Sequence, residues 1–216
     1  MADLRFQDAE DIVAHWSSLR KGPLAPLKGD IVLRAISGLL PRVFLVQKTD
    51  GVWTFRLAGS AFYLLYGREL APFAMRDGVR VPGEAFAAIW GSAASVVENA
   101  MVEASARCRP LLVRSNSYSS EGDVETDTVL MPMRSSAELS EPDMFIGLQS
   151  YAKTRELWWF MNRPIIDVVV RGVGMVPERR EPEAEKRGRE VPALRVVAPR
   201  PAAPVRFTVI QGGVGA

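Results

Sequence analysis

The stretch Trp53–Leu70, WTFRLAGSAFYLLYGREL, decides the fold of this 216-residue chain. Its first half alternates apolar residues with mixed ones, which is the period of a β-strand with one face turned inward. A turn at Gly59 follows, and then apolar side chains recur at spacings of three and four until Gly67 allows a left-handed stop. A helix of about two turns is not stable alone. We therefore expect it to pack on the sheet to which the strand belongs.

The flanking sequence predicts further helices and strands. An apolar stripe of Ile12, Val13, Trp16 and Leu19 indicates a first helix that ends at Gly22-Pro23, and a second helix starts at Asp30 and stops before Pro41. A hairpin, a long amphipathic helix and three more strands follow. We expect strands at 42–48 and 52–58 joined by Thr49-Asp50-Gly51, a helix at about 86–101, and strands near 111–119, 124–133 and 143–150.

The predicted strands carry apolar residues at both odd and even positions, and therefore on both faces, as in the run Leu111-Leu112-Val113. A sheet with one wet face should instead alternate, so we expect both faces to be covered. The helices at 62–66 and 86–101 would cover one face. The N-terminal helix, alone or with a second subunit, would cover the other, and we expect its Trp16 to mediate dimerisation.

Several segments resemble a PAS-like domain family that is widespread in alphaproteobacteria. The clearest are FRLAGS at 55–60 and YGREL at 66–70. Others that fit are WSSLRKG at 16–22, LLPRVFL at 39–45, CRPL at 108–111, VLMPM at 129–133 and FTVIQGG at 207–213. The resemblance spans about residues 10 to 150.

The resemblance implies an α+β, PAS-like fold with a five-stranded antiparallel sheet flanked by helices. It also implies a sensory or protein-interaction module, without a known ligand for most members. Its structural residues here are Arg56, Gly59, Gly67, Arg68 and Glu69. Trp53, Phe55, Tyr63, Tyr66 and Trp90 either pack in the core or line a ligand pocket, and packing is the commoner role of large apolar residues at such spacings.

Composition divides the chain into three parts. We expect an N-terminal helix and linker at 1–28, a PAS-like domain at 29–160, and a largely disordered tail rich in Pro, Arg and Glu at 161–216. Basic and acidic residues are interleaved in the tail, so we expect no nucleic-acid binding. We also expect a cytoplasmic protein, since no segment reads as a signal peptide or membrane span.

Candidate catalytic residues are few. His15 is the only histidine and Cys108 the only cysteine. Glu121, Asp123, Glu125 and Asp127 share one parity and could hold a hard cation, although a solvated hairpin tip is the simpler interpretation. We therefore expect no enzyme, no metal site and no specified cofactor, but a regulatory module that signals to a separate protein. A small-molecule sensor is the alternative.

Trp158 and Trp159 follow the last predicted strand. They form either an exposed partner-binding patch or a lid on the domain. We interpret them as an interface, because the linker begins soon afterwards and leaves little to bury them. The expected partner is a second copy of the chain, another protein, or both.

Overall fold

The computed structural model describes residues 4–66, 73–76, 79–82, 85–120, 122–151 and 165–177, apart from the side chains of Tyr63 and of residues 73–82. One compact unit spans Met1–Glu178, and a second unit, Arg179–Ala216, lies outside the described residues. In chain order the elements are α1 Gln7–Ser18, the 3₁₀ helices η1 Lys28–Asp30 and η2 Leu33–Arg42, β1 Val43–Thr49, β2 Val52–Ala58, α2 Ser60–Tyr66, β3 Phe73–Arg76, β4 Val79–Pro82, the 3₁₀ helices η3 Phe86–Ile89 and η4 Gly91–Ala93, α3 Ala94–Arg107, β5 Leu111–Ser119, β6 Gly122–Met133, β7 Met144–Tyr151 and β8 Asp167–Met175.

Six strands form one antiparallel sheet in the order β2-β1-β7-β6-β5-β8, and β3 pairs with β4 separately. The predicted hairpin is confirmed. Its turn residues Asp50 and Gly51 both have positive φ, at 51° and 84°, which is the backbone twist that joins two antiparallel strands tightly. The three predicted strands after the helix are confirmed as β5, β6 and β7.

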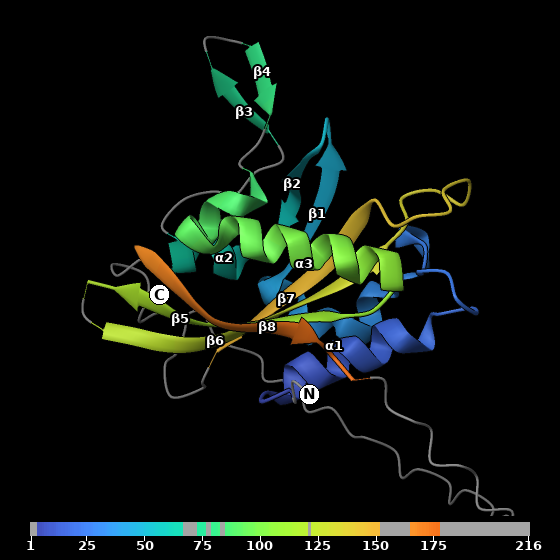
Figure 1. Cartoon of the computed structure of the whole chain (residues 1–216), viewed down its shortest axis with the longest axis horizontal. Coiled ribbons are helices and arrows are strands. Elements are labelled where there is room, and N and C mark those ends of the chain that lie inside the picture. The colour runs from blue at the N-terminus through green and yellow to red at the C-terminus, as the bar shows by residue number, and fades with distance from the viewer. Residues whose placement is uncertain are drawn as a thin grey trace, which may run out of the picture. The chain divides into compact units, whose positions relative to one another are not determined.

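Both faces of the sheet are covered, as the apolar strands predicted (Figure 1). On one face, side chains of α2, η3 and α3 pack against strand residues such as Phe44, Leu130 and Phe145. On the opposite face, Ala9, Ile12 and Trp16 of α1 pack against residues such as Leu112, Val129 and Ile146.

The N-terminal helix belongs to this unit rather than to a separate segment 1–28. Trp16 is 1% exposed, and its indole Nε1 donates a hydrogen bond of 2.9 Å to the carbonyl oxygen of Pro132 in β6. The packing expected of Trp16 is therefore confirmed. The indole is thus covered within the chain, and a contact of this helix with a second subunit stays a prediction.

The structure corrects the prediction of five strands and of a tail that begins at residue 161. β8 pairs with β5 from Asp167 to Met175 and so adds a sixth strand. Val168 and Val170 of β8 pack against the same core as β5. Those buried contacts and the pairing with β5 stabilise β8 as a strand. In the sequence, only a short apolar run indicated it, because the pairing with the edge of β5 cannot be seen there.

Two predicted helices also differ in form. The helix predicted at 86–101 is divided into η3, η4 and α3, because Gly91 takes a left-handed conformation with φ of 52°. The helix predicted from Asp30 to Pro41 is a 3₁₀ helix with non-helical backbone angles at Ile36. None of the described helices combines the length and the apolar character that crossing a bilayer requires.

Gly59 marks the place where the end of β2 meets the end of η2. Its amide donates a hydrogen bond of 2.8 Å to the carbonyl of Val43. A Cβ atom added at Gly59 would lie 2.3 Å from the backbone oxygens of both Leu40 and Pro41. Because these obstacles are backbone atoms, a side chain fits here only if the two elements separate.

We predict that Gly59→Ala lowers the free energy of unfolding by about 3 kcal/mol, since it forces an extra methyl group against main-chain atoms. Urea unfolding followed by circular dichroism measures this. Gly38→Ala is the matched control, because a Cβ there meets no atom within 4 Å, and it should change stability by less than about 1 kcal/mol. Equal effects of the two substitutions would contradict the close approach.

Candidate functional site

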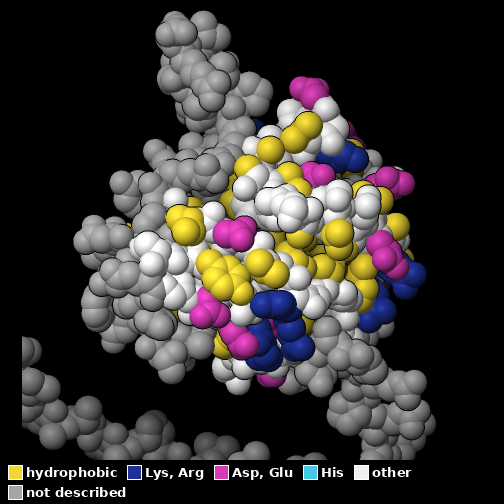
Figure 2. Space-filling model, turned by 60° about the vertical axis from the view of Figure 1, so that its left-hand side comes forward, with side chains coloured by type: hydrophobic (Ala, Val, Ile, Leu, Met, Phe, Trp, Pro, Cys, Tyr) yellow, Lys and Arg dark blue, Asp and Glu magenta, His cyan; other side chains and the backbone are white. Residues whose placement is uncertain are grey.

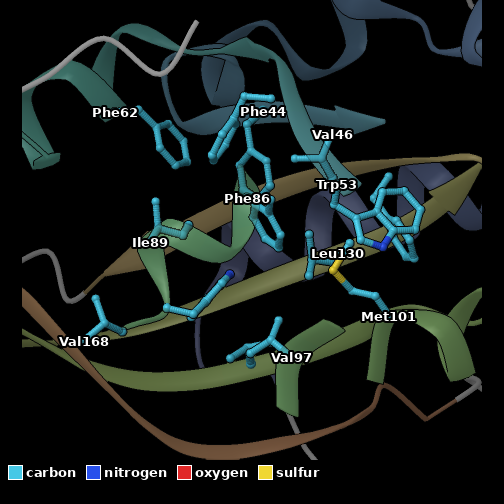
Figure 3. Packing of buried hydrophobic residues seen from close by; sticks show 14 of the residues in the cluster. Phe44, Val46, Trp53, Phe62, Phe86, Ile89, Val97, Met101, Leu130 and Val168 are labelled. Atoms are coloured by element: carbon cyan, nitrogen blue, oxygen red, sulfur yellow. The ribbon is translucent and has the colours of Figure 1, made fainter. Parts of the chain in front are cut away.

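An aromatic cluster occupies the core between the sheet and the helices α2 and η3. Four rings of this cluster, Phe44, Phe55, Phe62 and Phe86, lie with centroids 5.1–6.4 Å apart. Figure 3 shows Phe44, Phe62 and Phe86 turned toward one another. Offset and edge-to-face contacts at such distances stabilise a core beyond the burial of area alone.

Four of the predicted ligand-binding residues lie buried in this same core. Trp53 meets Phe145 edge to face with a centroid distance of 5.1 Å. Tyr66 stacks on Phe62 at 5.9 Å, and Trp90 meets Phe86 at 5.7 Å. Phe55, the fourth, contacts Phe62 and Phe86 as above. The structure thus brings Trp53, Phe55, Tyr66 and Trp90 together in one cluster. Its other phenylalanines, Phe44, Phe62 and Phe86, were not among the predicted ligand-binding residues. Their binding of a ligand stays a prediction.

Other predicted residues contribute less to this arrangement. Arg56 is exposed, at a bulge in β2, and Gly59 has the steric role described above. The side chain of Tyr63, together with Gly67, Arg68, Glu69, Trp158 and Trp159, lies outside the described part of the structure.

A buried polar patch lies on the same face of the sheet as the aromatic cluster. Its strand residues alternate along β5 and β6 and continue onto β7; they are Ser115, Ser117, Thr126, Thr128 and Gln149, each no more than 1% exposed. Ser115 Oγ lies 2.7 Å from Thr126 Oγ1. The alternation of Ser115 with Ser117 and of Thr126 with Thr128 was visible in the sequence, but hydroxyl residues within strands are common and were not singled out.

The patch connects to the aromatic cluster through Tyr66. The side-chain amide of Gln149 donates a hydrogen bond of 3.1 Å to the Tyr66 hydroxyl. Thr128 lies opposite Gln149 in the ladder, and its buried Oγ1 has no hydrogen-bond partner among the described residues. The buried indole Nε1 of Trp90 is likewise unpaired within the described residues. A buried polar atom left unpaired costs about 1–3 kcal/mol, so these atoms are candidate contacts for a polar ligand group.

The acidic row on β6 faces the other side of the sheet, toward α1. Asp127 is 0% exposed, and Arg5 donates to its carboxylate from Nε at 3.1 Å and also from a terminal nitrogen. Arg5 forms a second ion pair of 2.6 Å with Glu125. The hydrogen bonds to Asp127 are the main reason that the pKa of Arg5 is raised. Asn116 donates to Asp123 at 3.2 Å.

These pairings correct the interpretation of the acidic row as a wholly solvated hairpin tip. Asp127 and Glu125 hold the segment before α1 against the sheet, and no group of side chains suited to a metal ion is found among the residues that the structure describes. Glu121 lies outside those residues.

The single histidine and the single cysteine lie on different sides of the sheet. His15 is half-buried on α1, whereas Cys108 directly follows α3 in a left-handed conformation with φ of 47°. α1 and α3 cover opposite faces. The two residues therefore cannot form a nucleophile–base pair within one chain in this structure.

Comparison with known proteins identifies the architecture. A family model described as a PAS domain matches residues 5–150, from the segment before α1 to the end of β7. Among solved structures, the chain is similar to the crystal structure of a Rhodobacter sphaeroides LOV protein, with 17% sequence identity, 68% of each chain covered and a TM-score of 0.36. No match was found among curated proteins.

We predict that Arg5→Met lowers the free energy of unfolding by about 2 kcal/mol. Among the described residues, it leaves the buried Asp127 carboxylate with only the more distant cation of Arg114, whose Nε is 3.8 Å away. Arg107→Met removes an exposed pair with Glu103 on α3 and should cost under about 0.5 kcal/mol. Urea unfolding at neutral pH compares the two variants. A loss in Arg5→Met no larger than in the control would show that Arg5 does not anchor the N-terminal segment.

Proposed function

Because the chain belongs to the PAS domain family, we propose that it is a non-catalytic regulatory module that passes a signal to a separate protein. The matched residues 5–150 include both helical layers and five of the six strands of the main sheet. The family match is the observation that carries the proposal.

The roles of the titratable side chains support a non-catalytic module. Asp127 binds Arg5, and Asp8 of α1 binds Arg42 at the end of η2. Asp143 accepts hydrogen bonds from Gln47 and Ser135; burial alone would raise its pKa, but these bonds lower it overall below the ordinary value. Each of these carboxylates links two segments of the chain. This structural role explains why each carboxylate is present, and no catalytic role is needed.

The signal is proposed to pass through Trp158 and Trp159, which follow β7 and precede β8 in the chain. Indole side chains supply much of the energy of protein interfaces when they insert into a partner's pockets.

We predict that the double substitution Trp158→Ala with Trp159→Ala weakens partner binding at least tenfold and leaves the melting temperature nearly unchanged. The partner is first identified by chemical cross-linking of the full-length protein in its native cell and mass spectrometry, and affinities are then measured with purified proteins. Leu33→Ala, at a residue 60% exposed on η2, is the control and should bind normally. Unfolding of the double variant would place the tryptophans in the core, and unchanged binding would move the interface elsewhere.

A small-molecule sensor is the second candidate. The observation that favours it is the buried Thr128 hydroxyl, which has no hydrogen-bond partner within the part of the chain that the structure describes. A polar ligand group held there would satisfy Thr128 and adjoin Gln149 and Tyr66. The aromatic cluster next to it would suit the apolar part of such a ligand.

We predict that native mass spectrometry of the purified full-length protein finds an added mass, and that Thr128→Val reduces its occupancy at least fivefold. Ser150→Ala is the control, since Ser150 lies on β7 one residue from Gln149 and so on the opposite face of the sheet. The sensor is contradicted if the purified protein carries no added mass and Thr128→Val raises its stability, because the substitution removes a hydroxyl that has no partner among the described residues.

A further inference from the structure

We propose that the polar patch beside the aromatic cluster receives an uncharged ligand that carries a hydrogen-bond acceptor on an apolar body. The inference rests on the small-molecule sensor, the second candidate above, and names the chemical class that this sensor binds. Two observations carry it: which charges are buried, and which buried polar atoms have no partner among the described residues.

Buried charge lies on the other side of the sheet. Among the described residues, Asp127 is the only buried residue that carries a charge, and it binds Arg5 on the face that α1 covers. The side chains buried around Thr128 are hydroxyls, an amide and apolar groups. Figure 2 shows acidic and basic side chains on the outer surface of the molecule.

An ion that entered this core would lose its hydration and would find no buried opposite charge among the described residues of that face. Burying an unpaired ion is far costlier than burying a neutral polar group, which needs only a hydrogen-bond partner. We therefore exclude carboxylate, phosphate and ammonium groups from the buried part of the ligand.

Two buried polar atoms without a partner in the described part of the chain define what the ligand must offer. Trp90 is 1% exposed, and its indole Nε1 can only donate, so the group that satisfies it must be an acceptor. Thr128 is also 1% exposed, and its Oγ1 can either donate or accept. A carbonyl, an ether or an unprotonated ring nitrogen satisfies the indole without bringing in a charge.

The other polar side chains of the patch already pair with one another. Ser115 and Ser117 lie 2.7 Å and 3.3 Å from Thr126 through their side-chain oxygens. The Tyr66 hydroxyl accepts a hydrogen bond of 3.1 Å from the Gln149 amide. A ligand with one or two acceptor atoms therefore matches the patch better than a polyol, whose many hydroxyls would need further partners.

The surroundings of the patch favour an apolar ligand body. Leu130 lies two residues after Thr128 and thus on the same face of β6, and Figure 3 shows it in one packed core with Phe86 and Ile89. Trp90 meets Phe86 edge to face. A flat aromatic body would contact these side chains in the geometry that aromatic rings prefer.

Three small probes of similar size test this class on the full-length protein at neutral pH. Acetophenone has a neutral acceptor, benzoate is charged, and ethylbenzene has no acceptor. Co-purified compounds are first identified by accurate mass and then removed with hydrophobic beads, and native mass spectrometry confirms the bare protein. In titrations followed by proton–nitrogen correlation NMR, acetophenone should bind with a dissociation constant at least about tenfold lower than either of the other two.

The indole N–H of Trp90 gives a direct readout of the acceptor. Its signal, assigned by its loss in Trp90→Phe, should move when acetophenone is added and stay in place with ethylbenzene. Thr128→Val should weaken acetophenone binding at least about fivefold. Ser150→Ala is the matched control and should bind normally, because Ser150 also has a buried hydroxyl without a partner among the described residues but lies on the opposite face. Circular dichroism confirms that each variant is folded.

The outcomes separate the ligand class from the sensor. Benzoate or ethylbenzene that binds as tightly as acetophenone would overturn the class and leave the sensor standing, and so would a co-purified compound without an uncharged acceptor group. A co-purified compound that has such a group supports the class even where the small probes bind too weakly to measure. If no probe binds and no compound co-purifies, the sensor itself fails and the proposal fails with it.

Discussion

Burial of both faces of the sheet is the constraint on which the rest of this structure depends. The central strands carry apolar side chains on both parities, and a solvent-exposed face of that kind would lose the hydrophobic stabilisation that folding needs. The chain meets this constraint with helices that lie far apart in sequence. α2 and α3 cover one face and α1 covers the other, so the N-terminal segment is part of the fold.

The two covered faces are built by different chemistry. The face under α1 is held by an indole hydrogen bond and by ion pairs that tie Arg5 to Asp127 and Asp8 to Arg42. The face under α2 and α3 combines phenylalanine rings with a patch of buried hydroxyl and amide groups. Apolar packing next to incompletely paired polar atoms is the composition of many ligand sites, so any sensing is proposed to occur on this second face.

A six-stranded sheet has two edges, and the chain protects them unequally. A bridge to Ala85 covers part of β2, whereas among the described residues β8 is paired with β5 alone. β8 lies outside the matched PAS region, which ends at residue 150. We place the proposed signalling contact at the two tryptophans that precede β8 in the chain, Trp158 and Trp159.

The sequence by itself determined the local elements whose patterns are short in range: the hairpin with its Asp50-Gly51 turn, strands β5 to β7, the first helix, and the need to cover both faces. Residues such as Trp53, Tyr66 and Trp90 could be grouped as core or pocket because aromatic spacing indicates burial. Only the tertiary structure decided that Arg5 binds Asp127, that Gly59 faces the backbone of Leu40 and Pro41, and that Asp167–Met175 becomes a strand. Each of these depends on segments that are distant in the chain, and neither hydrophobic period nor turn composition carries information about which distant segments will meet.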